Sequence, residues 1–172
     1  MKQPKLTYCA IVASVIAAIY HPIRAKAANP GWKKYQNGRF GYSVNYPADK
    51  LRALREADNG DGRSFQALQG HAKVAVWASY NLDQSLGDLA NEAEHGCAGD
   101  RAKYRVIRDQ KIPFFMALSC LKEGNKIFYT KALKCKDVIT QIEFTYPTEE
   151  EPIWDSVVRG MSSSLGAGCG FD

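Results

Sequence analysis

Residues 39–65, RFGYSVNYPADKLRALREADNGDGRSF, carry the strongest strand and turn signals of the chain. Aromatic or β-branched residues alternate there with small or polar ones, which is typical of a half-buried strand: Phe40, Tyr42, Val44 and Tyr46. Pro47 ends this strand, and residues 49–56 are expected to form a helical turn or an irregular arm. The tetrapeptide NGDG at 59–62 predicts a tight turn into the next strand, because glycine accepts positive φ without steric cost.

The rest of the chain predicts a sheet with two helices. Further strands are expected at 64–68, 73–80, 102–110, 114–121, 127–134 and 138–146. The strand at 73–80 has apolar residues on both faces, so we expect a central strand that is covered on both sides. Residues 29–37 are polar and are expected to be a lead-in to the domain.

The two helices have recognisable starts and ends. The first is expected at 82–95, with Asp83 or Ser85 as its cap and Gly96 after its end. The second begins at Pro152 and continues to about residue 164, with an apolar stripe formed by Ile153, Val157, Met161 and Leu165. Strands, a helix, a meander and a second helix, in that order, predict an α+β domain: an antiparallel sheet flanked by helices.

The first 27 residues have the features of a signal peptide. Lys2 and Lys5 precede an apolar run at 6–20, and Ala25-Lys26-Ala27 matches the small-x-small pattern of a cleavage site. The run is short for a membrane-spanning helix, which needs roughly 20 apolar residues, and an uncleaved anchor is the alternative. We therefore predict a signal peptide at 1–27, a single domain at 28–172, no stable membrane anchor after cleavage, and a periplasmic or secreted protein.

Removal of this segment leaves a nearly neutral chain. The whole chain has 23 Lys and Arg residues against 18 Asp and Glu. Four of the basic residues and none of the acidic ones lie in 1–27, so 19 basic residues remain against 18 acidic ones. This balance leaves no basic stripe for nucleic acid, whose binding requires many phosphates to be neutralised.

Four cysteines lie in the predicted domain, and an even number in an exported chain indicates disulfides: Cys97, Cys120, Cys135 and Cys169. The last helix must fold back over the sheet, which brings Cys169 towards Cys135 at the start of the final strand. Cys97 follows the first helix and enters the hairpin whose second strand carries Cys120. We therefore predict the pairs Cys97–Cys120 and Cys135–Cys169. The chain has no C-x-x-C pair, so neither a redox motif nor a zinc knuckle is expected.

The hairpin between Cys120 and Cys135 argues against a bridge between those two residues. A turn centred on residues 124–125 places Tyr129 opposite Cys120, which leaves Cys135 about 20 Å away. A disulfide tolerates Cα atoms only about 4.4–6.8 Å apart.

Few residues in the predicted domain could catalyse a reaction. It has two histidines, His71 in a turn and His95 at a helix end, and both positions have ordinary structural explanations. No nucleophile elbow, zinc-protease motif or phosphate-binding loop is present. The alternative is a minor envelope hydrolase that uses His71 or His95 with Asp58 or Asp61.

The turn at 59–62 and its neighbours form the candidate binding surface: Trp32, Arg39, Asp58, Asn59, Asp61 and Arg63. The segment superficially resembles a calcium loop. An alignment on Asp61-Gly62 puts Ala57 at the first ligand position and Leu68 at the twelfth, where a glutamate belongs, so the match fails. A weaker cation site remains an alternative, as does a paired-carboxylate site of the glycosidase type formed among Glu56, Asp58 and Asp61.

These segments resemble a group of uncharacterised exported bacterial proteins. The residues that carry the resemblance are Tyr35, Asn37, Arg39–Pro47, Ala57–Phe65 and Phe144–Pro147. The shape of that group is similar to the PsbP-like α/β/α sandwich, which is named for an extrinsic photosystem II subunit. Members of this fold mostly bind other proteins or small ligands, so the resemblance implies binding. The four-cysteine arrangement is not part of the general pattern.

We therefore expect a non-catalytic binding module without a cofactor, whose partner is a protein of the cell envelope. An inhibitor or immunity-type protein that acts on an envelope-directed enzyme is the sharpest form of this hypothesis. A structural envelope component is a further alternative. The sequence leaves the oligomeric state open.

Overall fold

A computed structural model describes residues 31–81, 83–110 and 114–169 of the chain, and the predicted signal peptide at 1–27 lies outside them. The strands form a two-stranded sheet, β1-β2, and a seven-stranded sheet of order β3-β4-β5-β9-β8-β7-β6. All neighbouring strands run antiparallel. The elements are β1 (Trp32–Gln36), β2 (Ser43–Pro47), β3 (Leu51–Glu56), β4 (Gly62–Ala67), β5 (Lys73–Tyr80), α1 (Leu86–His95), β6 (Ala102–Arg108), β7 (Phe114–Lys122), β8 (Lys126–Cys135), β9 (Val138–Pro147) and α2 (Glu151–Ser164).

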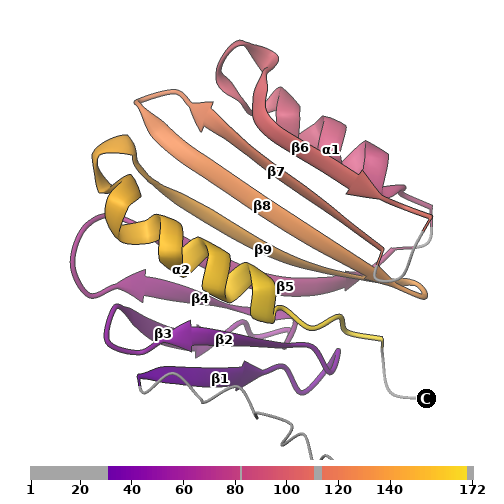
Figure 1. The fold of residues 1–172 in the computed structure, drawn as a ribbon. Coiled ribbons are helices and arrows are strands. Elements are labelled where there is room, and N and C mark those ends of the chain that lie inside the picture. The colour runs from indigo at the N-terminus through magenta and orange to yellow at the C-terminus, as the bar shows by residue number, and fades with distance from the viewer. Residues whose placement is uncertain (1–30, 82, 111–113, 170–172) are drawn as a thin grey trace, which may run out of the picture.

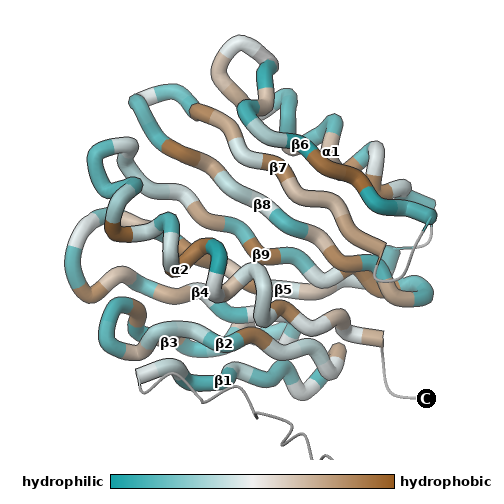
Figure 2. The backbone as a smooth tube through the Cα atoms, viewed as in Figure 1, coloured by the Kyte–Doolittle hydropathy of each residue, from teal (hydrophilic) through white to brown (hydrophobic). Residues whose placement is uncertain are grey.

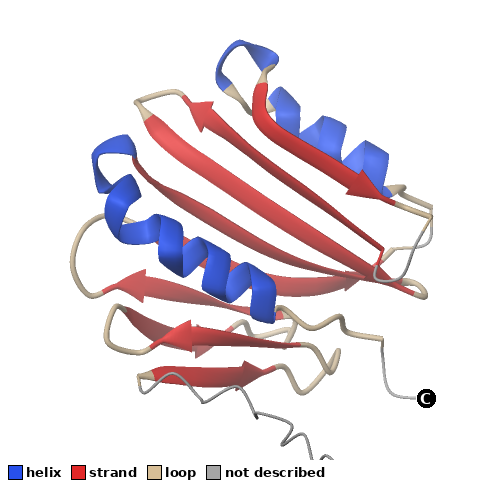
Figure 3. Ribbon diagram, viewed as in Figure 1, coloured by secondary structure: helices blue, strands red, loops and turns tan. Residues whose placement is uncertain are grey.

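The two helices lie on opposite faces of the large sheet (Figures 1 and 3). Helix α2 packs on β9, β8 and the hairpin strand β2, whereas α1 packs on β7, β6 and β8. The predicted α+β architecture, an antiparallel sheet flanked by helices, is thus confirmed. Because the helices are displaced towards opposite edges, each covers a different part of the sheet.

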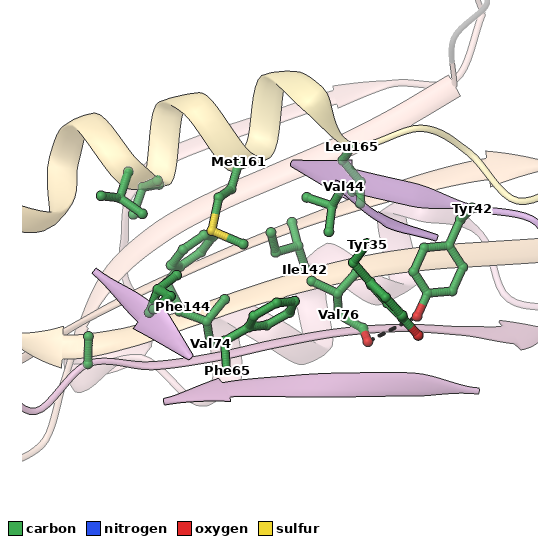
Figure 4. Packing of buried hydrophobic residues seen from close by; sticks show 14 of the residues in the cluster. Tyr35, Tyr42, Val44, Phe65, Val74, Val76, Ile142, Phe144, Met161 and Leu165 are labelled. Carbon is green, nitrogen blue, oxygen red and sulfur yellow. Dashed lines mark hydrogen bonds between the residues drawn. The ribbon is translucent and has the colours of Figure 1, made fainter. Parts of the chain in front are cut away.

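The main core lies between the sheet and the layer made by α2 and the β1-β2 hairpin. Trp154 and Met161 of α2 are buried, as are Ile142 and Phe144 of β9. Figure 4 shows Met161 pointing from the helix towards Phe144, and the Tyr42 hydroxyl donating to the Val76 carbonyl at 3.1 Å. Burial of so many large apolar side chains is the principal stabilising contribution of this face.

The opposite face has a smaller core beneath α1. Leu86 and Ala90 of α1 pack against Met116, Ala132 and Ile139 of β7, β8 and β9. Ser85 caps the helix: its side chain accepts a hydrogen bond from the backbone N–H of Asp88, whose carboxylate accepts one from the backbone of Ser85. Of the two caps predicted, Ser85 is therefore the one used, and the helix begins at Leu86 rather than at 82.

Two segments expected to lack strand structure are strands. Residues 29–37 were predicted as a lead-in, but Trp32–Gln36 forms β1 and pairs with β2. Most of β1 is hydrophilic (Figure 2), so its sequence carries no strand periodicity and the pairing depends on its partner. Residues 51–56 were predicted as a helical turn or an irregular arm, but they form edge strand β3 against β4, with a register shift between Ala53 and Glu56. Their helix-forming residues are overridden by tertiary pairing.

Two finer predictions are also corrected. Ile153 is exposed and Trp154 occupies its place in the buried stripe of α2, because a strict four-residue step drifts away from the 3.6-residue period of a helix. Phe128, not Tyr129, lies opposite Cys120, because Lys122 pairs with Lys126 and three residues, rather than two, form the turn.

The predicted disulfides are confirmed. Cys97 pairs with Cys120 at a Cα separation of 5.7 Å, and Cys135 pairs with Cys169 at 5.1 Å. The first bridge ties the end of α1 to β7, and the second ties the tail after α2 to the end of β8. Disulfides of this kind persist in oxidising compartments.

Candidate functional site

The predicted binding turn at 59–62 is built on a buried asparagine. The Asn37 side chain is fully buried, and its Oδ1 accepts hydrogen bonds from the backbone N–H groups of Arg39 (3.1 Å) and Phe40 (2.7 Å). Its Nδ2 donates to the Gly60 carbonyl and to Glu56 Oε1, each at 2.8 Å. Asn37 therefore connects the turn after β1 to the turn after β3. These hydrogen bonds give both turns a structural role.

The exposed residues of this turn bond mainly to one another. Arg39 Nη1 donates to the Asn59 carbonyl at 2.7 Å, and Asn59 Nδ2 donates to Asp61 Oδ2 at 2.7 Å. Asp58 pairs with Arg55 at 2.8 Å, and both side chains are largely exposed. The structure thus brings four of the six candidate residues together: Arg39, Asp58, Asn59 and Asp61.

Arg63 lies beneath the turn rather than on its surface. Its side chain is only 27% exposed, and its guanidinium lies 4.6 Å from the Tyr35 ring centre and 3.5 Å from the Glu56 carboxylate. Burial raises the pKa of the Tyr35 phenol, so the hydroxyl stays protonated and donates to Glu56 Oε1 at 2.9 Å. Arg63 therefore lies beside the turn but offers little exposed surface to a ligand.

Trp32 does not belong to this surface. Five residues of strand, about 17 Å, separate it from Asn37 at the other end of β1. Its ring packs on α2 above Gly160, where a Cβ would come within 2.3 Å of the ring. Trp32 thus anchors the hairpin to the helix.

Neither histidine meets the aspartates proposed as its partners. His71 lies after β4, and its ring Nδ1 is 2.9 Å from Glu150 Oε1, whereas Asp61 precedes β4 at the other end of the strand. His95 lies at the end of α1 and shares a pocket with Lys73 at the start of β5, but the Asp61 carbonyl bonds to Ala78 near the end of β5. The strand length leaves each pair roughly 17–20 Å apart.

A second candidate surface lies on the other face of the large sheet. On the α1 side, α1 covers β6, β7 and β8, and within the described part of the chain no helix lies over β4 and β5. Ala75, Glu143 and Thr130 are register partners on β5, β9 and β8, so their side chains share this face. The strand at 73–80 was predicted to be covered on both sides, but Trp77 is only partly buried here.

Three adjoining hollows follow this face, and together we call them the open groove. The central hollow, about 430 Å³, lies beside α1 and is lined by Trp77, Gln141 and Glu143 among others. The edge hollow, about 440 Å³, lies over β4 and β5 and also reaches Glu143. The basic pocket, about 730 Å³, shares Lys122 with the central hollow and Lys73 with the edge hollow.

Glu143 lies in the middle of this groove on the central strand β9. Burial raises the pKa of its carboxyl above the ordinary value, and the Lys122 ammonium offsets this only in part. Across residues 31–81, 83–110 and 114–169, no hydrogen bond or salt bridge is made to its carboxylate. Because partly buried carboxylates are normally satisfied, an unpartnered one in a hollow is a candidate ligand contact.

The end of the groove is positively charged. Three lysines and His95 line the basic pocket: Lys73 opens β5, Lys122 ends β7 and Lys126 opens β8. Glu123 is the acidic residue in the same lining, and Thr145 adds a hydroxyl. Lys122 Nζ lies 3.7 Å from the centre of the Phe128 ring, which holds one ammonium in place by a cation–π contact.

The polar residues of β9 are the feature of the sequence that indicates this groove. In β9, Gln141, Glu143 and Thr145 alternate with buried apolar residues, so one face of a central strand is polar. A polar face on a central strand indicates an open face, as antiparallel sheets often have. Which residues meet there depends on the strand register, which the sequence does not reveal.

Among the described residues, no group of three or more His, Cys, Asp or Glu side chains is arranged to hold a metal ion. None of the helices within the described ranges has the length and apolar character that a membrane crossing requires.

The chain was compared with known proteins. No protein-family model matches it, and no curated protein matches it. The solution structure of cyanobacterial PsbP (CyanoP) from Synechocystis sp. PCC 6803 is similar, with a TM-score of 0.61 and 13% identity over 83% of this chain and 95% of that chain. A crystal structure from Bacteroides thetaiotaomicron VPI-5482 has a TM-score of 0.49 and 17% identity, over 80% of this chain and 48% of that chain. The antiparallel sheet, its two helices and the CyanoP likeness together show that this chain has a PsbP-like fold.

Proposed function

We propose that this protein is a non-catalytic binding module of the periplasm or the extracellular space, and that its partner occupies the open groove. The observation that carries the proposal is the Glu143 carboxylate, which is half-buried, has no partner among the described residues and lines both the central hollow and the edge hollow. Polar groups left unsatisfied in a concave surface are the usual points of ligand recognition.

The compartment is supported by two independent features. The first is the signal-peptide pattern at residues 1–27, and the second is the pair of disulfides. The likeness to CyanoP is a likeness of fold, and its low identity transfers no partner to this chain.

Within this class we favour a protein partner, and specifically an envelope-directed enzyme that this module inhibits. A small, rigid, disulfide-bonded sheet with an open face suits such a role, because a preorganised surface loses little conformational entropy on binding. Inhibition by binding requires no catalytic residues in this protein, and both histidines lie far from Asp58 and Asp61.

A matched pair of variants tests which surface binds. Gln141→Arg places a bulky side chain in the central hollow, and Asn59→Arg places the same side chain on the exposed turn. Wild-type protein and both variants are used as bait in periplasmic extract, and the affinity of the captured protein is then measured directly. We expect Gln141→Arg to weaken binding about tenfold or more and Asn59→Arg to leave it unchanged.

If Asn59→Arg weakens binding and Gln141→Arg does not, the turn is the binding surface and this proposal is wrong. Two further outcomes separate the alternatives. Loss of a measured hydrolytic activity in His71→Ala or His95→Ala at unchanged melting temperature would make the protein an enzyme. Co-purification with a large assembly at fixed stoichiometry would make it a structural envelope component.

A further inference from the structure

We infer that the basic pocket binds a compact oxyanion, a carboxylate or a phosphate, at the end of the ligand that occupies the open groove. The inference deepens the proposed function, because it names the chemistry that one end of the groove recognises. It rests on the arrangement of three ammonium groups that come from three different strands.

The strand register places these ammonium groups at one end of one face. Lys73 pairs with Thr145, Thr145 pairs with Phe128, and Phe128 pairs with Cys120, so a single row crosses β5, β9, β8 and β7. Lys122 and Lys126 pair with each other two residues beyond that row. Because side chains alternate along a strand, they point to the same side as Cys120 and Phe128. The fold therefore brings Lys73, which is distant in the sequence, to the hollow that the β7-β8 hairpin lines with Lys122 and Lys126.

In the part of the chain that the structure describes, these three lysines form no ion pairs that would stabilise the fold. Among the described residues, neither Lys73 nor Lys126 makes a salt bridge or a side-chain hydrogen bond. Within the described ranges, Lys122 makes a cation–π contact with Phe128 and is attracted at longer range to Glu143. Three ammonium groups and a single carboxylate, that of Glu123, line this hollow, so its positive charge favours the entry of an anion.

The positive charge of the basic pocket contrasts with the nearly neutral charge of residues 28–172 as a whole. Apart from residues 1–27, the sequence has 19 basic residues and 18 acidic ones, so a general excess of positive charge does not account for the pocket. Lysine ammonium groups bind carboxylate and phosphate as point charges, and the Thr145 hydroxyl can donate a further hydrogen bond.

Glu143 adds selectivity to this pocket. It lies two residues from Thr145 on β9, about 7 Å along the strand, and its carboxylate repels a second anionic group at that distance. A ligand with an anion at one end and a hydrogen-bond donor or cation about 7 Å away would satisfy both positions. A uniformly anionic polymer would not.

The experiment uses inorganic phosphate and acetate as probes of the two oxyanions, with sodium chloride at equal ionic strength as the reference. Full-length mature protein is titrated and followed by amide chemical shifts. We expect saturable shifts confined to the neighbourhood of the basic pocket for at least one probe. The variant Lys73→Gln/Lys126→Gln should weaken that binding by about tenfold or more per lysine removed, whereas the matched variant Lys33→Gln/Lys34→Gln on β1 should not.

Three results would overturn the inference: no saturable shift with either probe, shifts that map elsewhere, or an equal loss of binding in both double variants. Melting temperatures of the variants show whether they are folded. Failure here is distinguishable from failure of the proposed function. If a partner binds through the central hollow but no oxyanion binds, only the oxyanion inference is wrong. If an oxyanion binds but no partner is captured, only the proposed function is wrong.

Discussion

Glu150 and Glu143 are both shielded from solvent to a large degree, but the two faces of the sheet treat them differently. Glu150, just before α2, accepts hydrogen bonds from the His71 backbone N–H at 2.9 Å and from the Trp154 indole at 2.8 Å. Glu143, on the α1 side, has no such partner within the described ranges. Glu150 therefore helps to hold the fold together, whereas Glu143 is left available to a ligand.

The same contrast holds for the neutral polar groups. Under the β1-β2 hairpin, the buried Asn37 amide uses both of its ends in hydrogen bonds. In the groove, the described contacts of Gln141 include no hydrogen bond. Substitutions on the closed side should therefore reduce stability, and substitutions in the groove should reduce binding.

The largest effect is expected for Asn37→Ala. The substitution leaves the backbone N–H groups of Arg39 and Phe40 and the Gly60 carbonyl without partners, at about 1–3 kcal/mol for each buried group. We expect the free energy of unfolding to fall by roughly 3–5 kcal/mol in urea denaturation. Asn45→Ala, at an exposed position of β2, is the matched control and should change it little. A loss below about 1 kcal/mol for Asn37→Ala would contradict the structural role of the network.

The next effect concerns the two disulfides. Cys97 and Cys120 are both buried, whereas Cys169 is exposed, so a mild reductant should reach Cys135–Cys169 first. Loss of a native bridge typically costs about 2–5 kcal/mol. Alkylation and mass spectrometry after partial reduction should therefore find the label on residues 135 and 169, in protein that melts at a lower temperature. Label that appears first on residues 97 and 120 would show that the groove side opens more readily than its burial implies.

Much of this architecture could be predicted from local patterns. Alternation identified β2 and β5, the Ser85 cap and Pro152 marked the two helices, and the need of α2 to fold back brought Cys169 to Cys135. Those signals are local, or depend only on element order. They succeed because the apolar period and the turn chemistry agree with the final structure.

The failures have one physical origin, which is dependence on partners distant in the sequence. The strand β1 has a hydrophilic sequence and exists because it pairs with β2, and β3 exists because it pairs with β4. The groove depends on register as well, since Lys73 and Lys122 line the same hollow only after β5, β9, β8 and β7 are aligned. The turn at 59–62 was conspicuous because glycine and polar residues are needed to close it, which is a structural requirement.

A smaller effect of definite sign is expected for Glu150→Gln. Desolvation opposes ionisation of Glu150, but hydrogen bonds from the His71 backbone and ring and from the Trp154 indole lower its pKa. A lowered folded-state pKa contributes stability that is present above the unfolded pKa, about 4.3, and is lost as the pH falls through the folded value. We expect the variant to lose about 1.5–3 kcal/mol at pH 7 and much less near pH 3, measured by urea denaturation at both pH values. An equal loss of stability at pH 7 and near pH 3 would show that the charge of Glu150 does not contribute to stability.

The smallest effect, with the opposite sign, is expected for Glu143→Gln. The folded state raises the pKa of this carboxyl, chiefly because it is buried, so the folded protein holds the proton more tightly than the unfolded chain does. Stability from this group is present below the unfolded pKa and declines as the pH rises through the folded value.

The amide variant should therefore be more stable than the wild type at pH 7, by about 0.5 kcal/mol, and no more stable at pH 3. Urea denaturation at the two pH values measures both differences, and binding of the groove partner should weaken in the same variant. Destabilisation at pH 7 would mean that Glu143 has a structural partner after all. The groove would then be an ordinary solvated face of the sheet, and the contrast with Glu150 would disappear.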